Sequence, residues 1–279
     1  MTQLQVGATL CFRPYSLDDA LRGLSEAGFR YVEIGAVKDW LENLDPDDIS
    51  AQALRRARQS LRRHGLQVVS VSGHSQLQTR QGMDRLRRVL HATRDLGAGV
   101  LNTYTGDVAT EDDYGNLLKH IRTVADEAQQ LDISLCLETD SNLVSTGAAG
   151  REILKRIGHP WVRLNYDTGN VAYYAGARAD EDIDHALPVL GHVHLKDQRG
   201  GKAHFDFPPL GEGEIDIGGV LRKLDEIGFA GPVSMEIEFD GNWPSWESCL
   251  DATKRGKDHW DALVAAAARA GHAAADTDR

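Results

Sequence analysis

The sequence predicts a single closed barrel of eight parallel strands and eight helices, the (β/α)8 or TIM barrel fold. Apolar, strand-forming runs alternate with segments of helical periodicity along nearly the whole chain. There are eight such pairs, and the length of 279 residues is close to the roughly 250 residues typical of this barrel. An open, doubly wound sheet is the alternative arrangement, but no Gly-x-Gly-x-x-Gly motif follows the first expected strand.

Each expected strand is a short apolar run bounded by turn residues, and each expected helix has one apolar face. Strands are expected at residues 4–10, 30–35, 67–73, 99–104, 133–139, 162–167, 190–196 and 232–238. Helices are expected near residues 16–27, 49–64, 79–96, 110–131, 147–157, 181–187, 216–227 and 246–270. Ser16 suits the N-cap of the first helix, and Gly28 suits its C-terminal end. We therefore expect one barrel with a C-terminal helix over residues 1–270 and a frayed tail over residues 271–279.

The composition limits the class of protein. No apolar run is long enough to span a membrane, and the first residues lack the basic and apolar regions of a signal peptide. The three cysteines are far apart and follow no metal-binding or disulfide spacing, which favours a reduced, cytoplasmic protein. The net charge of −11 argues against a nucleic-acid partner, because contact with phosphates needs clustered lysines and arginines.

Four consecutive expected strands, the fifth to the eighth, carry metal-binding side chains at their ends. In chain order these residues are Glu138, Asp167, His194 and Glu236. The C-terminal ends of barrel strands meet at one mouth, so we expect the four side chains to converge. Three converging carboxylates raise one another's pKa, and a divalent cation removes that conflict. Carboxylate oxygens and one imidazole suit Mn²⁺ or Mg²⁺, and also Zn²⁺ or Co²⁺.

Other polar residues near the same strand ends are candidates with a weaker basis. His192 lies on the same strand face as His194, one layer deeper, either as a packed histidine or as a partner of the metal ligand. His74 is a candidate catalytic group, with packing as the alternative. Lys196 is a candidate catalytic group that holds a substrate oxygen, or else it pairs with a carboxylate. Candidate substrate contacts, each also explicable by hydrogen bonding or solvation, are Glu33, Arg199 and His204.

Four segments of the chain resemble the xylose-isomerase-like barrel superfamily, and within it the sugar phosphate isomerase/epimerase group. These segments are Cys136-Leu137-Glu138-Thr139, Asn165-Tyr166-Asp167-Thr168-Gly169-Asn170, His192-Val193-His194-Leu195-Lys196-Asp197 and Met235-Glu236. The group includes tagatose 3-epimerases, hydroxypyruvate isomerases and inosose dehydratases. The resemblance implies a single divalent ion, often Mn²⁺, held by the four strand-end residues. It also implies that Glu138 and Glu236 exchange protons on opposite faces of a sugar.

The chain departs from the ketose epimerases of this group at one position. Where they have a histidine three residues after the aspartate, this chain has Asn170, a further candidate substrate contact. The departure affects the expected ketose 3-epimerase activity and leaves the expected metal site intact.

The expected activity is a metal-dependent sugar, keto-sugar or polyol isomerisation or epimerisation. It begins with removal of a proton next to a carbonyl and proceeds through a metal-stabilised enediolate. The alternative is a metal-dependent lyase or dehydratase that acts on a keto-inositol or a 3-keto glycoside, including C-glycosides. An abasic-site endonuclease would need further histidines for three zinc ions and a basic groove, and a sugar binder without turnover is also open. The expected partner is a small sugar, with no nucleic acid and no membrane, and the resemblance adds a homo-oligomer or a small partner subunit.

Overall fold

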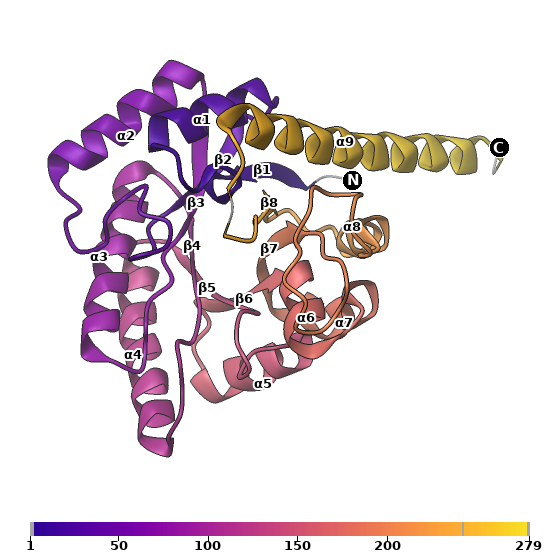
Figure 1. The fold of residues 1–279 in the computed structure, drawn as a ribbon. Coiled ribbons are helices and arrows are strands. Elements are labelled where there is room, and N and C mark those ends of the chain that lie inside the picture. The colour runs from indigo at the N-terminus through magenta and orange to yellow at the C-terminus, as the bar shows by residue number, and fades with distance from the viewer. Residues whose placement is uncertain (1–2, 242, 278–279) are drawn as a thin grey trace.

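The strands close into the predicted barrel. In the computed structural model, which describes residues 3–241 and 243–277, the eight strands pair in parallel and in chain order. Strand β1 (Leu4–Ala8) also pairs with β8 (Pro232–Glu236), which closes the ring. Helices surround the strands (Figure 1). The predicted fold class is therefore confirmed.

The observed elements agree closely with the predicted ones. The other strands are β2 (Tyr31–Gly35), β3 (Gln67–Ser72), β4 (Val100–Thr103), β5 (Ser134–Glu138), β6 (Val162–Asp167) and β7 (Leu190–Lys196). The helices are α1 (Leu17–Glu26), α2 (Ala51–His64), α3 (Arg80–Leu96), α4 (Glu111–Gln130), α5 (Gly147–Ile157), α6 (Thr168–Ala175), α7 (Ala179–Ala186), α8 (Ile217–Glu226) and α9 (Trp246–Thr277). Two short 3-10 turns are η1 (Thr9–Phe12) and η2 (Leu187–Val189). Every predicted strand ends within two residues of the observed one.

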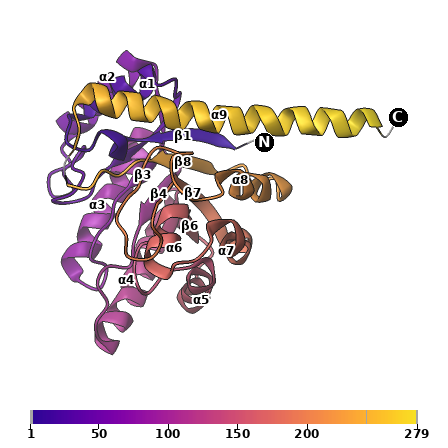
Figure 2. The same ribbon diagram turned by 45° about the vertical axis from the view of Figure 1, so that its right-hand side comes forward.

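Two helices differ from expectation. The sequence does not predict α6, because its first five residues are all buried and the segment therefore lacks alternating apolar and polar faces. Helix α9 continues past residue 270 as far as Thr277 and projects beyond the barrel (Figure 2). Residues 278–279 lie outside the described part of the chain, so the frayed end stays a prediction. None of the helices in the described ranges combines the length and apolar character needed to cross a bilayer.

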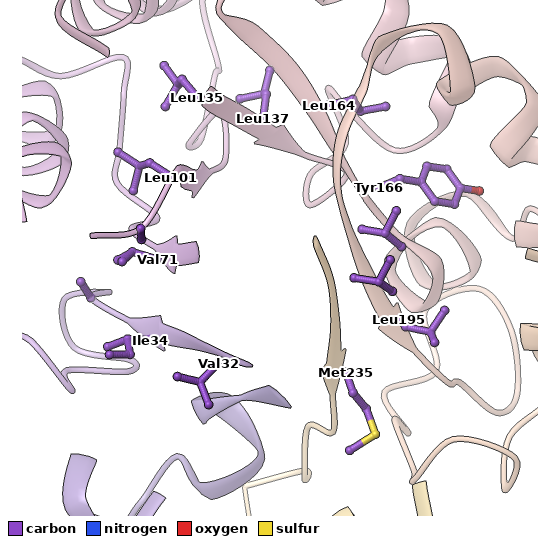
Figure 3. Close-up of a cluster of buried hydrophobic side chains, with 14 of the residues drawn as sticks. Val32, Ile34, Val71, Leu101, Leu135, Leu137, Leu164, Tyr166, Leu195 and Met235 are labelled. Atoms are coloured by element: carbon purple, nitrogen blue, oxygen red, sulfur yellow. The ribbon is translucent and has the colours of Figure 1, made fainter. Parts of the chain in front are cut away.

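Alternate strand residues separate an apolar outer layer from a polar barrel interior. Side chains such as Val32, Leu101 and Leu195 belong to the main apolar core and lie around the ring of strands (Figure 3). The intervening residues point into the barrel. Glu33 on β2 accepts hydrogen bonds there from Ser70 on β3 at 2.6 Å and from Ser234 on β8 at 2.9 Å. The interior of this barrel is therefore a hydrogen-bonded polar layer beneath the mouth.

The long segment between β7 and α8 is held by one buried carboxylate, that of Asp197. Its oxygens accept backbone N–H groups from Gln198 at 2.9 Å, Gly211 at 2.8 Å, Gly213 at 2.9 Å and Ile215 at 3.1 Å. A Cβ atom at Gly213 would collide with this carboxylate, so the close approach requires glycine. The segment thus has a defined course where it passes over the mouth of the barrel.

We expect Asp197→Ala to lower the free energy of unfolding by about 3 kcal/mol, because buried N–H groups bonded to a carboxylate lose their acceptor. Asp216→Ala is the matched control, since Asp216 caps α8 with one hydrogen bond to the Gly219 N–H at 2.8 Å. That variant is expected to cost about 1 kcal/mol. Urea unfolding followed by circular dichroism measures both. Equal losses in the two variants would contradict the role given to Asp197.

Candidate active site

A cavity of about 410 Å³ opens at the C-terminal ends of the strands. Strand ends supply its charged floor, and the segments that follow all eight strands supply its walls. The predicted residues Glu33, His74, Glu138, Asn170, Lys196 and Glu236 all line it. The sequence therefore located the cavity correctly, as the rule for barrel strand ends requires.

The four strand-end residues meet around one atom, Nδ1 of His194. This nitrogen is 3.2 Å from Oε2 of Glu138, 3.6 Å from Oε1 of Glu236 and 3.8 Å from Oδ2 of Asp167. All four side chains are buried, with exposed side-chain fractions between 0% and 6%. Convergence of these four residues, which the sequence predicts, is therefore present in the structure.

The electrostatics of this group suit a bound cation. Burial raises the pKa of Asp167 to about 8; Lys196 opposes this rise, and the nearby carboxylates of Glu138 and Glu236 add to it. Burial also raises the pKa of Glu236, against the opposing effects of His194 and Lys196. Oδ2 of Asp167 is buried and has no hydrogen-bond partner among the described residues. The buried Glu138, Asp167 and His194 side chains could hold a metal ion, and a divalent ion would remove the repulsion between these carboxylates.

Glu33 fixes the orientation of His194 from below. Its Oε1 is 2.9 Å from Nε2 of His194, and its Oε2 is 3.0 Å from Nε2 of His192. Burial raises the pKa of Glu33, but the His194 and His192 imidazoles outweigh it and hold that pKa well below its usual range. Nδ1 of His194 is left to face the three carboxylates. This arrangement, a carboxylate behind a candidate ligand histidine, fits the hydrogen-bond acceptor alternative for Glu33.

His192 lies one layer deeper, as expected from its position on the strand. Its Nδ1 is 2.9 Å from Oδ1 of Asn165, and its Nε2 is 3.1 Å from the Ser234 hydroxyl. The His192 and His194 rings meet edge to face, with centroids 5.1 Å apart. Both ring nitrogens therefore have partners, and His192 serves the polar interior rather than the cavity surface.

His74 and Asp140 flank Glu138 on the side of the cavity formed by the loops after β3 and β5. Nε2 of His74 is 3.1 Å from Oε2 of Glu138 and 3.8 Å from Oδ2 of Asp140. Burial raises the pKa of Asp140 to about 6, and the charge on Glu138 adds to the rise. The Tyr174 hydroxyl donates to Asp140 at 2.9 Å. Asp140 was not among the predicted residues, although it follows Glu138 at the spacing that places strand residues on one face.

The Lys196 ammonium lies among carboxylates. Its Nζ is 2.7 Å from Oε2 of Glu238, 3.4 Å from Oε2 of Glu236 and 3.7 Å from Oδ2 of Asp167. It also lies 4.7 Å from the ring centroid of Phe207. Glu238 was also not among the predicted residues, although it follows Glu236 by two positions, the spacing of strand residues on one face.

Two predicted substrate contacts are not brought to the cavity. Neither Arg199 nor His204 is among the described residues that line it. Arg199 pairs with Asp206 at 3.4 Å, and the ring of His204 bonds to the Arg199 carbonyl at 3.0 Å. Asn170, by contrast, donates to Oε1 of Glu138 at 3.2 Å and so supports that carboxylate.

The upper wall of the cavity is aromatic. The side chains are Trp40, Tyr104, Tyr173, Tyr174, Phe205 and Phe207. Phe205 and Phe207 stack edge to face with centroids 4.9 Å apart, and Tyr173 contacts both. The site thus combines a charged floor with an apolar rim, as small-molecule sites commonly do.

The fold is that of a known class of barrel. The chain belongs to the xylose isomerase-like TIM barrel family, whose model matches residues 21–269. The resemblance stated from the sequence motifs is therefore confirmed.

Individual members of the family give the comparison more detail. The chain is 28% identical over 240 residues to an L-ribulose 3-epimerase of Mesorhizobium japonicum, covering 79% of this chain and 75% of that protein. It is 26% identical over 166 residues to the L-ribulose-5-phosphate 3-epimerase UlaE of Shigella boydii, covering 56% of each. A solved structure of an L-ribulose 3-epimerase superposes with a TM-score of 0.78 at 22% identity, covering 96% of this chain and 97% of that one.

We expect Glu33→Gln to weaken Mn²⁺ binding by roughly 10–100-fold, because the amide no longer holds His194 with a charged acceptor. Calorimetric titration of metal-free protein measures the affinity, and circular dichroism checks the fold. Glu152→Gln is the control, since Glu152 pairs with Arg156 at 3.0 Å on the surface of α5, away from the cavity. Equal affinities for folded Glu33→Gln and the control would rule out this role.

Proposed function

We propose that the protein is a sugar epimerase or isomerase that uses one divalent metal ion, with Mn²⁺ as the foremost candidate. Membership of the xylose isomerase-like family and similarity to an L-ribulose 3-epimerase support an activity of this class. The observation that carries the proposal is the approach of two glutamates, Glu138 and Glu236, to the same atom of His194, at 3.2 Å and 3.6 Å. An epimerase needs one base and one acid at the same carbon, and two buried carboxylates provide them.

The proposed ligands are Glu138, Asp167, His194 and Glu236. Their buried carboxylate oxygens and imidazole nitrogen fit a divalent cation, as the unpartnered Oδ2 of Asp167 and the raised pKa values of Asp167 and Glu236 indicate. When bound, the ion supplies positive charge that polarises a sugar carbonyl and its neighbouring hydroxyl.

The protein's own residues then move the proton. One glutamate removes the hydrogen on the carbon next to the carbonyl, and the other returns a proton to the opposite face, which inverts that carbon. Glu138 is held for this task by Asn165 at 2.9 Å, Asn170 at 3.2 Å and His74 at 3.1 Å. Return of the proton to the adjacent carbon would instead isomerise the sugar. Asn170 takes part through Glu138, so the departure from the histidine of other ketose epimerases leaves a hydrogen-bond donor in place.

We expect incubation of the Mn²⁺-loaded protein with L-ribulose in D₂O to place deuterium on the carbon next to the carbonyl. Glu236→Gln is expected to lower the turnover rate by about 10²–10⁴-fold, because the amide cannot exchange the proton. NMR measures the deuterium, and metal analysis of the variant separates proton transfer from metal loss. The surface variant Glu152→Gln should keep wild-type turnover. Release of water or of an aglycone without deuterium in recovered sugar would instead support elimination, the alternative activity.

Chelation is expected to remove the activity. Treatment with EDTA should leave a folded protein without turnover, and Mn²⁺ should restore the rate at about one ion per chain, because the carboxylates need a compensating charge. Activity and bound metal are measured on the same samples. Full activity in protein shown to be free of metal would refute the metal-dependent mechanism.

A further inference from the structure

The charges that line the cavity bear on which sugars it accepts. Five carboxylate side chains line it against two lysines, and the described lining residues include no arginine. The carboxylates are Glu33, Glu138, Asp140, Glu236 and Glu238. The one lining histidine, His74, is already 3.1 Å from Glu138. A phosphate ester would bring a further charge of about −1.5 to −2, so it would need a cation with free donors.

The deeper lysine is surrounded by carboxylates. The Lys196 Nζ has three of them within 3.7 Å, those of Glu238, Glu236 and Asp167. Its shortest contact, 2.7 Å, is to Glu238, and the two side chains are only 4% and 10% exposed. The backbone N–H of Glu238 also donates to the Phe207 carbonyl at 3.3 Å, which ties this carboxylate to the aromatic rim. An anion that reached Lys196 would have to displace a buried ion pair, which is unfavourable because it leaves a carboxylate buried without its partner.

The lysine at the rim is also paired. Lys38 lies 3.3 Å from Glu42 and 3.2 Å from Asp45. Arg13, which lies outside the lining, stacks its guanidinium 3.4 Å from the ring centroid of Trp40. Both lysines of the described lining therefore already lie beside carboxylates.

The remaining surface of the cavity favours carbon and hydroxyl groups over charge. Three large apolar side chains are exposed in the described part of the chain, and two of them, Trp40 at 43% and Phe205 at 36%, line this cavity. Aromatic faces pack well against the C–H groups of a sugar. A phosphate placed against them would be partly buried without a partner, which is costly.

From these contacts we infer that the site binds an uncharged sugar and discriminates against its phosphate ester. Glu238 is a specificity-determining residue, because its carboxylate pairs with the Lys196 ammonium. The inference rests on the proposed function and narrows its substrate class. The chain is similar both to an epimerase named for L-ribulose and to one named for L-ribulose 5-phosphate. The charges of the cavity favour the uncharged sugar. A phosphate ester would bury a charge without a partner, and such a penalty on the wrong ligand produces specificity.

The test uses the Mn²⁺-loaded protein with ribitol and ribitol 5-phosphate, which have no carbonyl and are not turned over. Calorimetric titration is expected to give a Kd for ribitol at least about 100-fold lower than the Kd for ribitol 5-phosphate. Glu238→Gln should tighten binding of the phosphate ester at least about tenfold, because it frees the Lys196 ammonium. Glu212→Gln is the control, since Glu212 lies in the segment after β7, pairs with Arg255 at 2.6 Å and is not among the described residues that line the cavity.

Each outcome decides the inference independently of turnover. Equal or tighter binding of the phosphate ester, binding of neither compound, or an unchanged phosphate affinity in Glu238→Gln would overturn it. Loss of phosphate binding in Arg13→Ala would then identify the stacked arginine as the anion site. If ribitol is preferred but L-ribulose gains no deuterium in D₂O, the substrate class stands and the proposed epimerase activity fails.

Discussion

The contact between Glu33 and His194, inside the barrel and away from water, orders the rest of the site. The carboxylate takes one ring nitrogen at 2.9 Å, so the other nitrogen faces Glu138, Asp167 and Glu236. Ionised groups buried in this way cost several kcal/mol each unless neighbours compensate them. Each buried charge is therefore stabilised by an opposite charge beside it, and the imidazole lies between Glu33 and the three strand-end carboxylates.

The residues that stabilise the fold and the residues of the candidate active site lie in different layers of the barrel. The apolar faces of the strands and the surrounding helices form the main core, whereas the barrel interior includes buried serine, asparagine, histidine and carboxylate side chains. Burial leaves Asp167 and Glu236 with raised pKa values. Repulsion between carboxylates at the mouth thus lowers stability locally, and the apolar core compensates for it. Proteins commonly have such locally destabilising groups at functional sites.

Much of this structure could be predicted from single residues and their spacing. The strands were predictable because short apolar runs bounded by turn residues are typical of buried strands. The candidate metal ligands were predictable because the C-terminal ends of parallel barrel strands meet at one rim. Partners across the cavity could not be predicted. Lys196 pairs with Glu238, and Asp140 approaches His74, only because of how neighbouring strands and loops are placed. Arg199 was a candidate substrate contact, with solvation in its loop as the alternative, and in the folded loop it pairs with Asp206.

The hydrogen bonds of the Asp197 carboxylate limit how the segment after β7 can be engineered. The residue follows Lys196 directly in the chain, and its oxygens hold the backbone of Gly211, Gly213 and Ile215. In the chain, Phe205 and Phe207 lie between Asp197 and Gly211. A transplanted loop would therefore keep its shape in this scaffold only if it retained the aspartate and both glycines. Recombination of natural loops at this position should use those residues as crossover boundaries.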